Sequence, residues 1–499
     1  MKLSQLNICT GALFSTVGVL LVMPTVAAED AAAPAATFGA PSAATQAALG
    51  VSAGPSPAQG VAMAGWMFYP SFMAGAVFND NIYQRPFDRV AGVGVRLRPA
   101  LDARLDNGIH KTNAYLMADV QIYPGLGESY RFLPRPLVDA RPTNVTGRAG
   151  FAHNWEPMAD LSFQVMADYT RQNGVFGSNF GVGSGGANLL SANTISAAQQ
   201  YTNQYSAYVS VEKKFAGRWF LRGTTGAQYI TYDSRPSDPW WYAPFGGANF
   251  ANRSLNGLNY TGSIRGGMWV TPQLYAFVEP GADLRFYQNY WADTNGYRVV
   301  GGLGSDMISL FRGEIYGGYQ SQTSARGYFG TTSRPAFGAR IFYYPTPYIT
   351  LTASVDQTLS SAAQQPTATG FGVPLSTAAL PWTSAAASKT LQARVQGDYA
   401  LSQYWSAYVR GGYGETQFSN PWNKQNAWTT GVGLNYNFWR NISATIEYQF
   451  SRTFSTNPWG FFGWNTPIFA YSWPAAMLLA GKPSGFAQNI VSAGLTYRY

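Results

Sequence analysis

The chain has few of the residues that proteins use for metal binding, nucleophilic chemistry and covalent cross-linking. It contains one cysteine, Cys9, and two histidines, His110 and His153, in 499 residues. A single cysteine excludes an internal disulfide, and zinc or haem sites draw their ligands mainly from these two residue types. Neither histidine has a serine and an acid close by in the sequence. We therefore expect no enzyme activity, no metal and no cofactor.

Charged residues are also scarce, at 11% of the chain, against about 25% in typical soluble domains. Aromatic residues make up 15%, and there are 54 glycines. Beyond the N-terminal segment no apolar run reaches about 18 residues, so the sequence predicts no transmembrane helix. Few charges combined with many tyrosines and glycines favour extended strands that have an apolar face and are joined by tight turns.

Two N-terminal segments differ from the rest of the chain. Lys2, the apolar residues 12–23 and the small residues of "TVAA" are typical of a secretory signal, which we predict over residues 1–28. Residues 29–62 are mostly Ala, Pro, Ser and Gly, which bury too little apolar area to become ordered. They are predicted to form a disordered periplasmic leader, and residues 63–499 to form one domain.

That domain repeats one pattern. In "VGVRLRPALDARLD", residues 93–106, the apolar residues lie on one parity and the charged residues on the other. A period of two places the two sets on opposite faces of a strand, and the "DNG" at 106–108 that follows is typical of a hairpin turn. Segments of this kind recur to the C-terminus, and they predict about 18 strands, with a range of roughly 16–18.

The connections between these segments alternate between short turns and long loops. The long ones cover residues 124–144, 173–200, 233–256, 361–387 and 456–487. Short turns on one rim and long loops on the other are typical of an all-β, antiparallel up-and-down transmembrane barrel of the outer membrane. A soluble propeller or sandwich is the alternative. The polar parity is rich in Ser, Thr, Gln, Asn and Gly but poor in Lys and Glu, which favours the barrel.

Three further expectations follow from a barrel. Hydrocarbon offers no partner to an open sheet edge, so the first and last strands should pair with each other. Pro70 in the first strand lacks a hydrogen-bond donor and should lie at a bulge or at an end. An aromatic girdle is expected near the short turns. The tryptophans expected in it are Trp155, Trp219, Trp269, Trp405 and Trp439.

The formal charge of +9 suggests a pore that prefers anions, but the parity predicted to face the lumen holds nearly equal numbers of arginines and acids. Arg96, Arg98 and Arg104, interrupted by Asp102, form a stripe of roughly 25 Å on one strand. This stripe is a candidate guide for an anionic solute. Charge ladders that stiffen the wall are the other interpretation. The other charges expected in the lumen are Asp119, Arg148, Asp168, Arg222, Arg265, Arg340, Arg394 and Arg410.

The chain ends in "SAGLTYRY", which alternates to its last residue. We expect Tyr497 and Tyr499 to face lipid in the closing strand. The spacing of Ser492, Gly494, Tyr497 and Tyr499 also resembles the terminal signal that the outer-membrane assembly machinery recognises.

Residues 68–83 and 94–123 resemble the beta-barrel porin 2 family of bacterial outer membranes. The resemblance is carried by Pro70, by the run "NDNIY" at 79–83, and by Arg98 and Pro99 before the strand enters a hairpin. It implies a porin-like barrel in the outer membrane of a Gram-negative bacterium, and some members are connected with surface polysaccharide. The family brings no agreed catalytic residues.

The sequence thus predicts a channel through which small hydrophilic solutes diffuse across the outer membrane. Two alternatives remain open: a component of exopolysaccharide export or attachment, and a structural surface barrel plugged by its own loops. Loop aromatics that would contact sugar, or pack on one another, are Trp240, Trp241, Trp459 and Trp464. The expected partners are membrane lipid, the assembly machinery, and small solutes or polysaccharide, but not nucleic acid. The sequence does not distinguish a monomer from a trimer.

Overall fold

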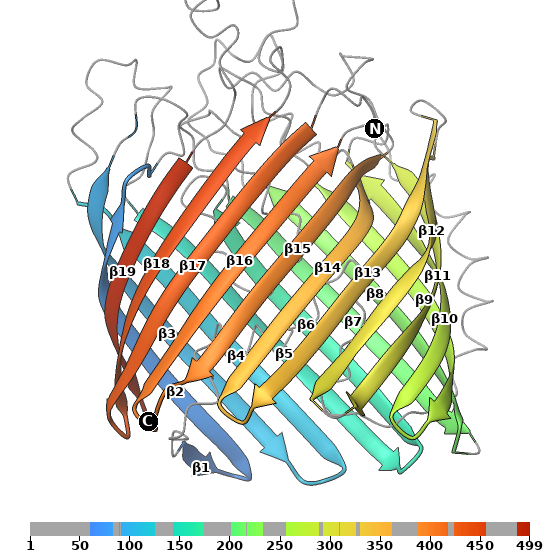
Figure 1. Ribbon diagram of the computed structural model, residues 1–499, viewed down its shortest axis with the longest axis horizontal. Coiled ribbons are helices and arrows are strands. Elements are labelled where there is room, and N and C mark those ends of the chain that lie inside the picture. Colours follow the sequence, from blue (N-terminus) through green and yellow to red (C-terminus); the bar gives the residue numbers. More distant parts are fainter. Residues whose placement is uncertain are drawn as a thin grey trace, which may run out of the picture.

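A computed structural model shows one antiparallel sheet that closes on itself as a barrel (Figure 1). The structure describes residues 60–82, 89, 91–124, 143–173, 201–215, 217–232, 256–288, 293–308, 310–325, 330–361, 387–417, 424–455 and 487–499. The predicted signal, most of the predicted leader, most of each long loop and the four loop tryptophans lie outside these ranges. Within them, no helix has the length and apolar character needed to span a bilayer.

The strands are β1 (Val61–Met63), β2 (Trp66–Asn79), β3 (Gly92–Asp106), β4 (His110–Ile122), β5 (Thr143–Met158), β6 (Leu161–Asn173), β7 (Tyr201–Phe215), β8 (Trp219–Tyr232), β9 (Gly257–Thr271), β10 (Leu274–Tyr287), β11 (Thr294–Ile308), β12 (Phe311–Ser324), β13 (Thr331–Thr346), β14 (Ile349–Ser361), β15 (Ala387–Ala400), β16 (Trp405–Gln417), β17 (Lys424–Trp439), β18 (Ile442–Ser455) and β19 (Ala487–Arg498).

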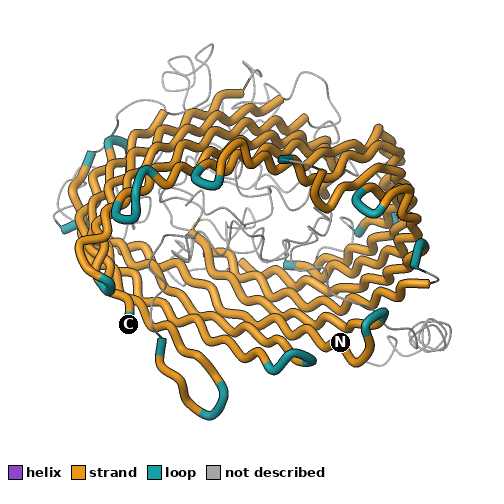
Figure 2. Tube along the Cα trace, turned by 60° about the horizontal axis from the view of Figure 1, so that its bottom comes forward, coloured by secondary structure: helices purple, strands orange, loops and turns teal. Residues whose placement is uncertain are grey.

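Each strand from β2 onward pairs with its neighbours in chain order, and β19 pairs with β2 to close an 18-strand barrel (Figure 2). The up-and-down fold and the pairing of first and last strands are therefore confirmed. The short β1 pairs with β2 in a hairpin, so Val61 and Ala62 of the expected leader lie in a strand. The short turns and the C-terminus share one rim (Figure 1), which is the periplasmic rim in outer-membrane barrels.

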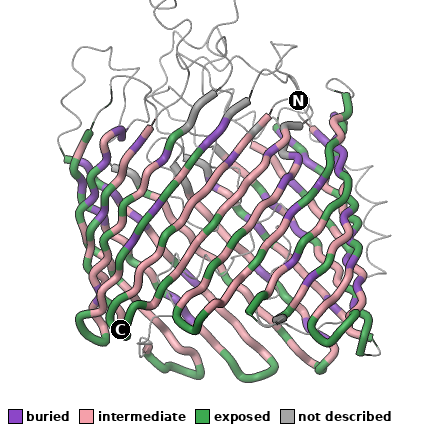
Figure 3. Tube along the Cα trace, viewed as in Figure 1, coloured by how far each residue is buried: buried purple, intermediate pink, exposed green. Residues whose placement is uncertain are grey.

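Side chains alternate between the two faces of the wall, as the period of two predicts. On β10, Val278 is 55% exposed on the outer face, whereas its neighbour Glu279 is 2% exposed on the lumenal side. Exposed and more buried positions alternate along the other strands as well (Figure 3). An apolar outer face matches hydrocarbon, and the polar side chains are left to the lumen.

The aromatic girdle is confirmed for four of its five expected tryptophans and is wrong for the fifth. Trp155, Trp219, Trp405 and Trp439 face outward near the short turns. Trp269 has the inward parity of β9, and its ring centroid lies 5.0 Å from that of Tyr275. Trp269 lies four residues after Arg265, which was expected in the lumen, so the alternation along β9 itself places this tryptophan inward.

The missing donor of Pro70 is accommodated at the periplasmic end of the closing seam. The registered pairs of β2 and β19 end at Ser71 and Arg498, so Pro70 lies one residue beyond them. The Pro70 carbonyl accepts from the Tyr499 N–H at 3.1 Å, and the Tyr499 carbonyl accepts from the Gly60 N–H at 3.1 Å. The Gly60 N–H thus donates to the Tyr499 carbonyl, to which Pro70 cannot donate because it has no N–H.

At the other end of the same seam, side chains continue the pairing beyond the ladder. The last registered pair is Asn79 with Ile490. The Gln488 amide donates to the Asn79 side-chain oxygen and to the Asn81 carbonyl, both at 3.0 Å, and the Asn81 amide donates to the Ala487 carbonyl at 3.0 Å. We call Asn79, Asp80, Asn81 and Gln488 the closing clasp.

Asp80 completes the closing clasp through one residue of β19. Its carboxylate accepts from both the backbone and the side-chain nitrogen of Asn489, each at 2.6 Å. Asn79, Asn81 and Gln488 are all at most 1% exposed. Buried polar groups are costly when they lack partners. These contacts therefore hold β2 and β19 together at the ends that lie away from the short turns.

We expect Gln488→Ala to lower the free energy of unfolding by about 2–4 kcal/mol, because it removes two buried hydrogen bonds across the seam, to the Asn79 side-chain oxygen and to the Asn81 carbonyl. The measurement is the urea midpoint of the purified barrel, together with the temperature at which its compact band is lost in SDS gels. Gln449→Ala is the control, because Gln449 lies on the lumenal parity of the neighbouring strand β18 but outside the clasp. Equal midpoints for the two variants would contradict the role of the clasp.

Candidate pore wall

The predicted arginine stripe on β3 is divided between two carboxylates. Arg96 holds Asp119 of β4 through two of its nitrogens, with Nη2 at 2.5 Å from Oδ2 and Nε at 3.0 Å from Oδ1. Arg98 reaches the same carboxylate, with its Nη2 at 3.1 Å from Oδ2. Asp119 is almost fully buried between the two guanidinium groups. Two guanidinium groups therefore share this carboxylate, and the charge of Glu447 on β18 also acts on both of them.

Arg104, the third arginine of the stripe, binds Asp102 on its own strand. The Nη2–Oδ2 distance is 2.5 Å, and the guanidinium carbon lies 5.1 Å from the centre of the Tyr69 ring on β2. Asp102, which interrupts the stripe in the sequence, is thus the partner of one of its arginines. The three arginines are not a row of free cations.

Three more predicted arginines have carboxylate partners on nearby strands. Arg148 on β5 contacts Asp168 on β6 at 2.8 Å, and the Tyr115 hydroxyl of β4 donates to the same carboxylate. Arg222 on β8 binds Glu212 on β7, with Nε 2.6 Å from Oε2. Arg410 on β16 binds Glu447 on β18, which lies two strands away. Each of these pairs is neutral.

Arg265 on β9 is the centre of the most extensive network. Its guanidinium donates to Glu279 on β10 at 2.6 Å and to Glu314 on β12 at 2.8 Å. Arg298 on β11 binds the other oxygen of Glu279 at 3.2 Å, and the Tyr275 hydroxyl donates to Glu314 at 3.1 Å. Two arginines therefore balance two glutamates, in a cluster where Arg265 is only 3% exposed.

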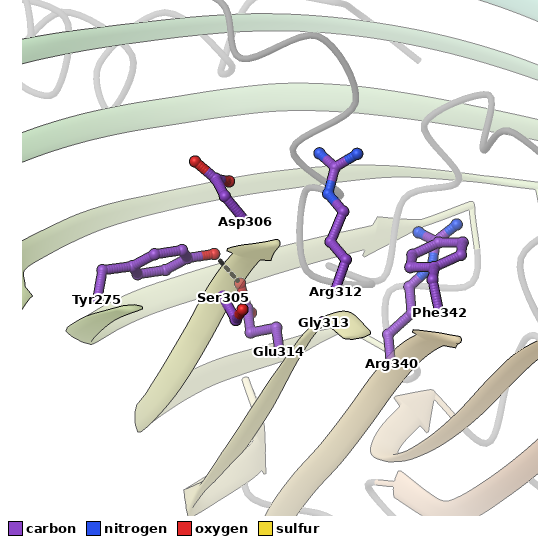
Figure 4. A pocket seen from close by; sticks show the side chains of 8 residues that line it. All are labelled: Tyr275, Ser305, Asp306, Arg312, Gly313, Glu314, Arg340 and Phe342. Atoms are coloured by element: carbon purple, nitrogen blue, oxygen red, sulfur yellow. Dashed lines mark hydrogen bonds between the residues drawn. The ribbon is translucent and has the colours of Figure 1, made fainter. Parts of the chain in front are cut away.

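Arg340 and Arg394 differ from the rest of the set. Arg340 lies with its guanidinium carbon 5.0 Å from the centre of the Phe342 ring, and it lines a pocket with Asp306, Arg312 and Glu314 (Figure 4). Arg394 on β15 donates to the Gln392 side chain at 3.3 Å. Among the ion pairs of the described residues, none joins Arg394 to a carboxylate.

The pairs and networks give the wall a nearly balanced charge. In the described part of the wall, most of the predicted arginines hold a carboxylate at ion-pair distance, and the surplus is small. The tyrosines that complete these clusters, Tyr115 and Tyr275, were not predicted as part of the site. Their inward parity was visible in the sequence, but their hydrogen-bond partners depend on the register between strands.

The described residues offer little for metal chemistry. None of their histidine, cysteine, aspartate and glutamate side chains form a group of three or more that could hold a metal ion. His110 and His153 stack, with ring centroids 5.4 Å apart, and the ring of His110 also stacks on that of Trp155. The Thr112 hydroxyl lies 2.8 Å from His153 Nδ1. These contacts are those of an aromatic cluster near the short-turn rim.

The four residues of the predicted assembly signal lie on β19 and just beyond its end. Tyr497 and Tyr499 are about half exposed on the outer face, and Ser492 is buried on the lumenal side. Gly494 pairs with Gly75 of β2, and a Cβ atom at Gly494 would lie 2.6 Å from the Met73 side chain. The nearest backbone atom, the Ala74 carbonyl oxygen, would lie 3.1 Å from that Cβ, so the two strands are closely packed at this point of the closing seam.

Comparisons with known proteins point to one family. The model of the family "Putative beta-barrel porin 2" matches residues 54–460. No curated protein matches the chain. Two solved structures with a related outline are those of the siderophore receptor PirA from Acinetobacter baumannii and of OccK8 (OprE) from Pseudomonas aeruginosa.

These structural likenesses are weak. PirA is 8% identical, with a TM-score of 0.40, 87% of this chain covered and 80% of that one. OccK8 is 10% identical, with a TM-score of 0.38, 87% of this chain covered and 98% of that one. We draw nothing about function from them, whereas the family match spans most of the chain. The chain belongs to the Putative beta-barrel porin 2 family and is a barrel of the Gram-negative outer membrane.

Proposed function

We propose that the protein is a weakly selective channel for the diffusion of small hydrophilic solutes across the outer membrane. An antiparallel barrel of this strand number is wide enough to enclose an aqueous path. The family match and the apolar outer face support a porin-like role in lipid. The polar inner face supports the passage of hydrophilic molecules.

The observation that carries the proposal is the pairing of the lumenal charges. An arginine in contact with a carboxylate acts at a distance as a dipole, and salt screens what remains over about 8–10 Å. Asp119 with Arg96 and Arg98, Asp102 with Arg104, and the Arg265 network all reduce the field of the wall in this way. The net charge of +9 therefore does not imply a strongly anion-selective pore.

The alternative role in polysaccharide export or attachment depended on Trp240, Trp241, Trp459 and Trp464. All four lie outside the described residues, and no described contact favours that role. The proposed path of a solute through the lumen therefore rests on the lumenal side chains of the described strands. Membrane lipid is a partner of the outer face, and we propose the assembly machinery as the partner of the C-terminal signal.

We expect Asp119→Asn to shift ion selectivity toward anions, because it leaves the charges of Arg96 and Arg98 without their shared carboxylate. One freed charge about 8 Å from a passing ion in water is worth about 0.5 kcal/mol, or roughly a twofold enrichment of anions at that level. The measurement is the reversal potential of single channels in planar bilayers under a salt gradient. Replacing all three stripe arginines by glutamine should shift it toward cations.

The control for this experiment removes a complete ion pair. The double variant Arg104→Gln with Asp102→Asn leaves the sum of charges unchanged and should keep the parent's reversal potential. If Asp119→Asn also keeps it while conductance persists, the stripe does not line the ion path. If the parent barrel inserts but never conducts, the proposed channel is wrong.

We expect deletion of Tyr497–Tyr499 to abolish assembly in the outer membrane. The deletion also removes backbone bonds, such as that from the Arg498 N–H to the Asn441 carbonyl at 2.7 Å. The double variant Tyr497→Ala with Tyr499→Ala keeps that backbone and should fail as well, whereas Arg498→Ala should assemble. The measurement is the heat-modifiable band in outer-membrane fractions, and a normal band after the deletion would refute the signal.

A further inference from the structure

The barrel wall is interrupted between β13 and β14 at the end opposite the short turns. The two strands pair from Thr346 and Ile349 up to Phe337 and Gln357, and no registered pair follows. Beyond that point, β13 remains paired with β12 up to Thr331, and β14 remains paired with β15 up to Ser361. The last part of β13 and the last part of β14 therefore run on without bonding each other in a ladder.

The end of β14 lies on the inner side of the wall. The Leu359 N–H donates to Gln320 Oε1 of β12 at 3.1 Å, and Arg285 Nη2 of β10 donates to the Leu359 carbonyl at 3.5 Å. Gln320 and Arg285 both have lumenal parity on their strands. The backbone of Leu359 donates one hydrogen bond to, and accepts another from, lumenal side chains of two other strands. This end of β14 must therefore lie on the lumenal side of those strands.

Burial gives independent support for this path. Gln357 and Leu359 share the parity of Leu351, which is 40% exposed on the outer face of β14. Yet Gln357 is 4% exposed and Leu359 is 5% exposed. The outer face of β14 is thus covered at this end. This is expected if the end of β14 lies on the lumenal side of β12 and β13.

Pro335 explains why the ladder stops. Beyond Phe337 and Gln357, the register would bring Ala336 opposite Thr358 and then Pro335 opposite Leu359, and hydrogen-bonded pairs alternate with non-bonded ones in an antiparallel ladder. Proline has no N–H, so it cannot donate to the Leu359 carbonyl as that pair requires. The Gln320 amide occupies the gap, because its Nε2 donates to the Pro335 carbonyl at 3.2 Å while its Oε1 accepts from Leu359. The Gln357 amide also donates to the Pro335 carbonyl, at 2.8 Å.

We propose that residues 358–361 of β14 form a strap that narrows the lumen away from the short-turn rim, and that Gln320 is the latch that holds it inward. On its β13 side the strap has side-chain hydrogen bonds to β12 and β10 in place of a ladder, and it begins where pairing with β13 ends, at Gln357. When the hydrogen bonds of Gln320 are lost, the strap moves outward into the plane of the barrel sheet. Its pairing with β15 moves the start of that strand with it.

The position of the strap can be measured without any conduction. Leu359→Cys, in a chain whose Cys9 is replaced by serine, places one thiol on the strap at a site that is nearly inaccessible in the latched state. The readout is the rate of its reaction with a water-soluble maleimide in detergent-solubilised, folded barrel. A cysteine at Thr331, an exposed position at the end of β13, gives the rate for a free thiol.

We expect Gln320→Ala to raise the labelling rate of the Leu359→Cys thiol at least tenfold. The matched control is Gln322→Ala. Gln322 lies on the same strand and the same face as Gln320 and is also buried, but its amide donates to Thr294 of β11 at 2.8 Å and not to β14. Labelling in that background should stay at the parent rate. Equal rates with the two alanine variants, or a parent rate equal to that of the Thr331→Cys thiol, would overturn the proposal.

Pro335→Ala supplies a second test that does not depend on the Gln320 variant folding. It restores the N–H that the ladder lacks, so Leu359 is expected to return to the wall with its side chain toward lipid. A fluorophore on the Leu359→Cys thiol should then be quenched by brominated lipid more strongly than in the parent barrel. Unchanged quenching in a folded Pro335→Ala barrel would also overturn the strap.

The role of the strap in conduction rests on the proposed channel function, and the two can fail separately. Gln320→Ala, but not Gln322→Ala, is expected to raise single-channel conductance. A labelling difference with no conductance in any variant would keep the strap and remove the channel. Conductance without a labelling difference would keep the channel and remove the strap.

Discussion

The constraint on which this structure depends is that every backbone N–H and C=O within hydrocarbon needs a partner inside the protein. An alternating sequence satisfies it only when each strand has a neighbour on both sides, so the sheet must close. The pairing of β2 with β19 is where that closure occurs. The apolar outer face, the polar inner face and the balanced lumenal charges all follow once the sheet is closed.

Two places where the main-chain ladder ends early show how the constraint is met by side chains. At the closing seam, the clasp carries hydrogen bonding beyond Asn79 and Ile490. Between β13 and β14, the Gln320 amide replaces the peptide group that Pro335 cannot supply. A carboxamide has the same donor and acceptor as a peptide unit, which is why asparagine and glutamine occur at both sites. The difference is that the first seam stays in line with the wall, whereas at the second β14 passes inside it.

The strand number, the faces of the strands and the closing pair were predictable, because a period of two is a local property of the sequence. The partners of the charges were not. Asp119 serves Arg96 and Arg98, although the residue directly opposite Arg96 is Gln121, since long side chains reach diagonal neighbours. The interruption at Pro335 was also missed, because it depends on the register between two strands and not on the alternation within one. Trp269 is a different case, because it shares the parity of Arg265 and the alternation within β9 already placed it inward. The Arg265 network joins four strands, β9 to β12, and no spacing within one strand indicates it.

The motif that made the family visible in the sequence concerns architecture more than transport. In the run "NDNIY", Asn79, Asp80 and Asn81 contact residues 487–489 at the opposite end of the chain. Pro70, the other marker, lies at the far end of the same seam. A resemblance carried by such residues therefore establishes how the barrel closes. For passage through the barrel we propose other residues, such as Asp119 and Gln320, whose contacts run between strands and which form no sequence motif.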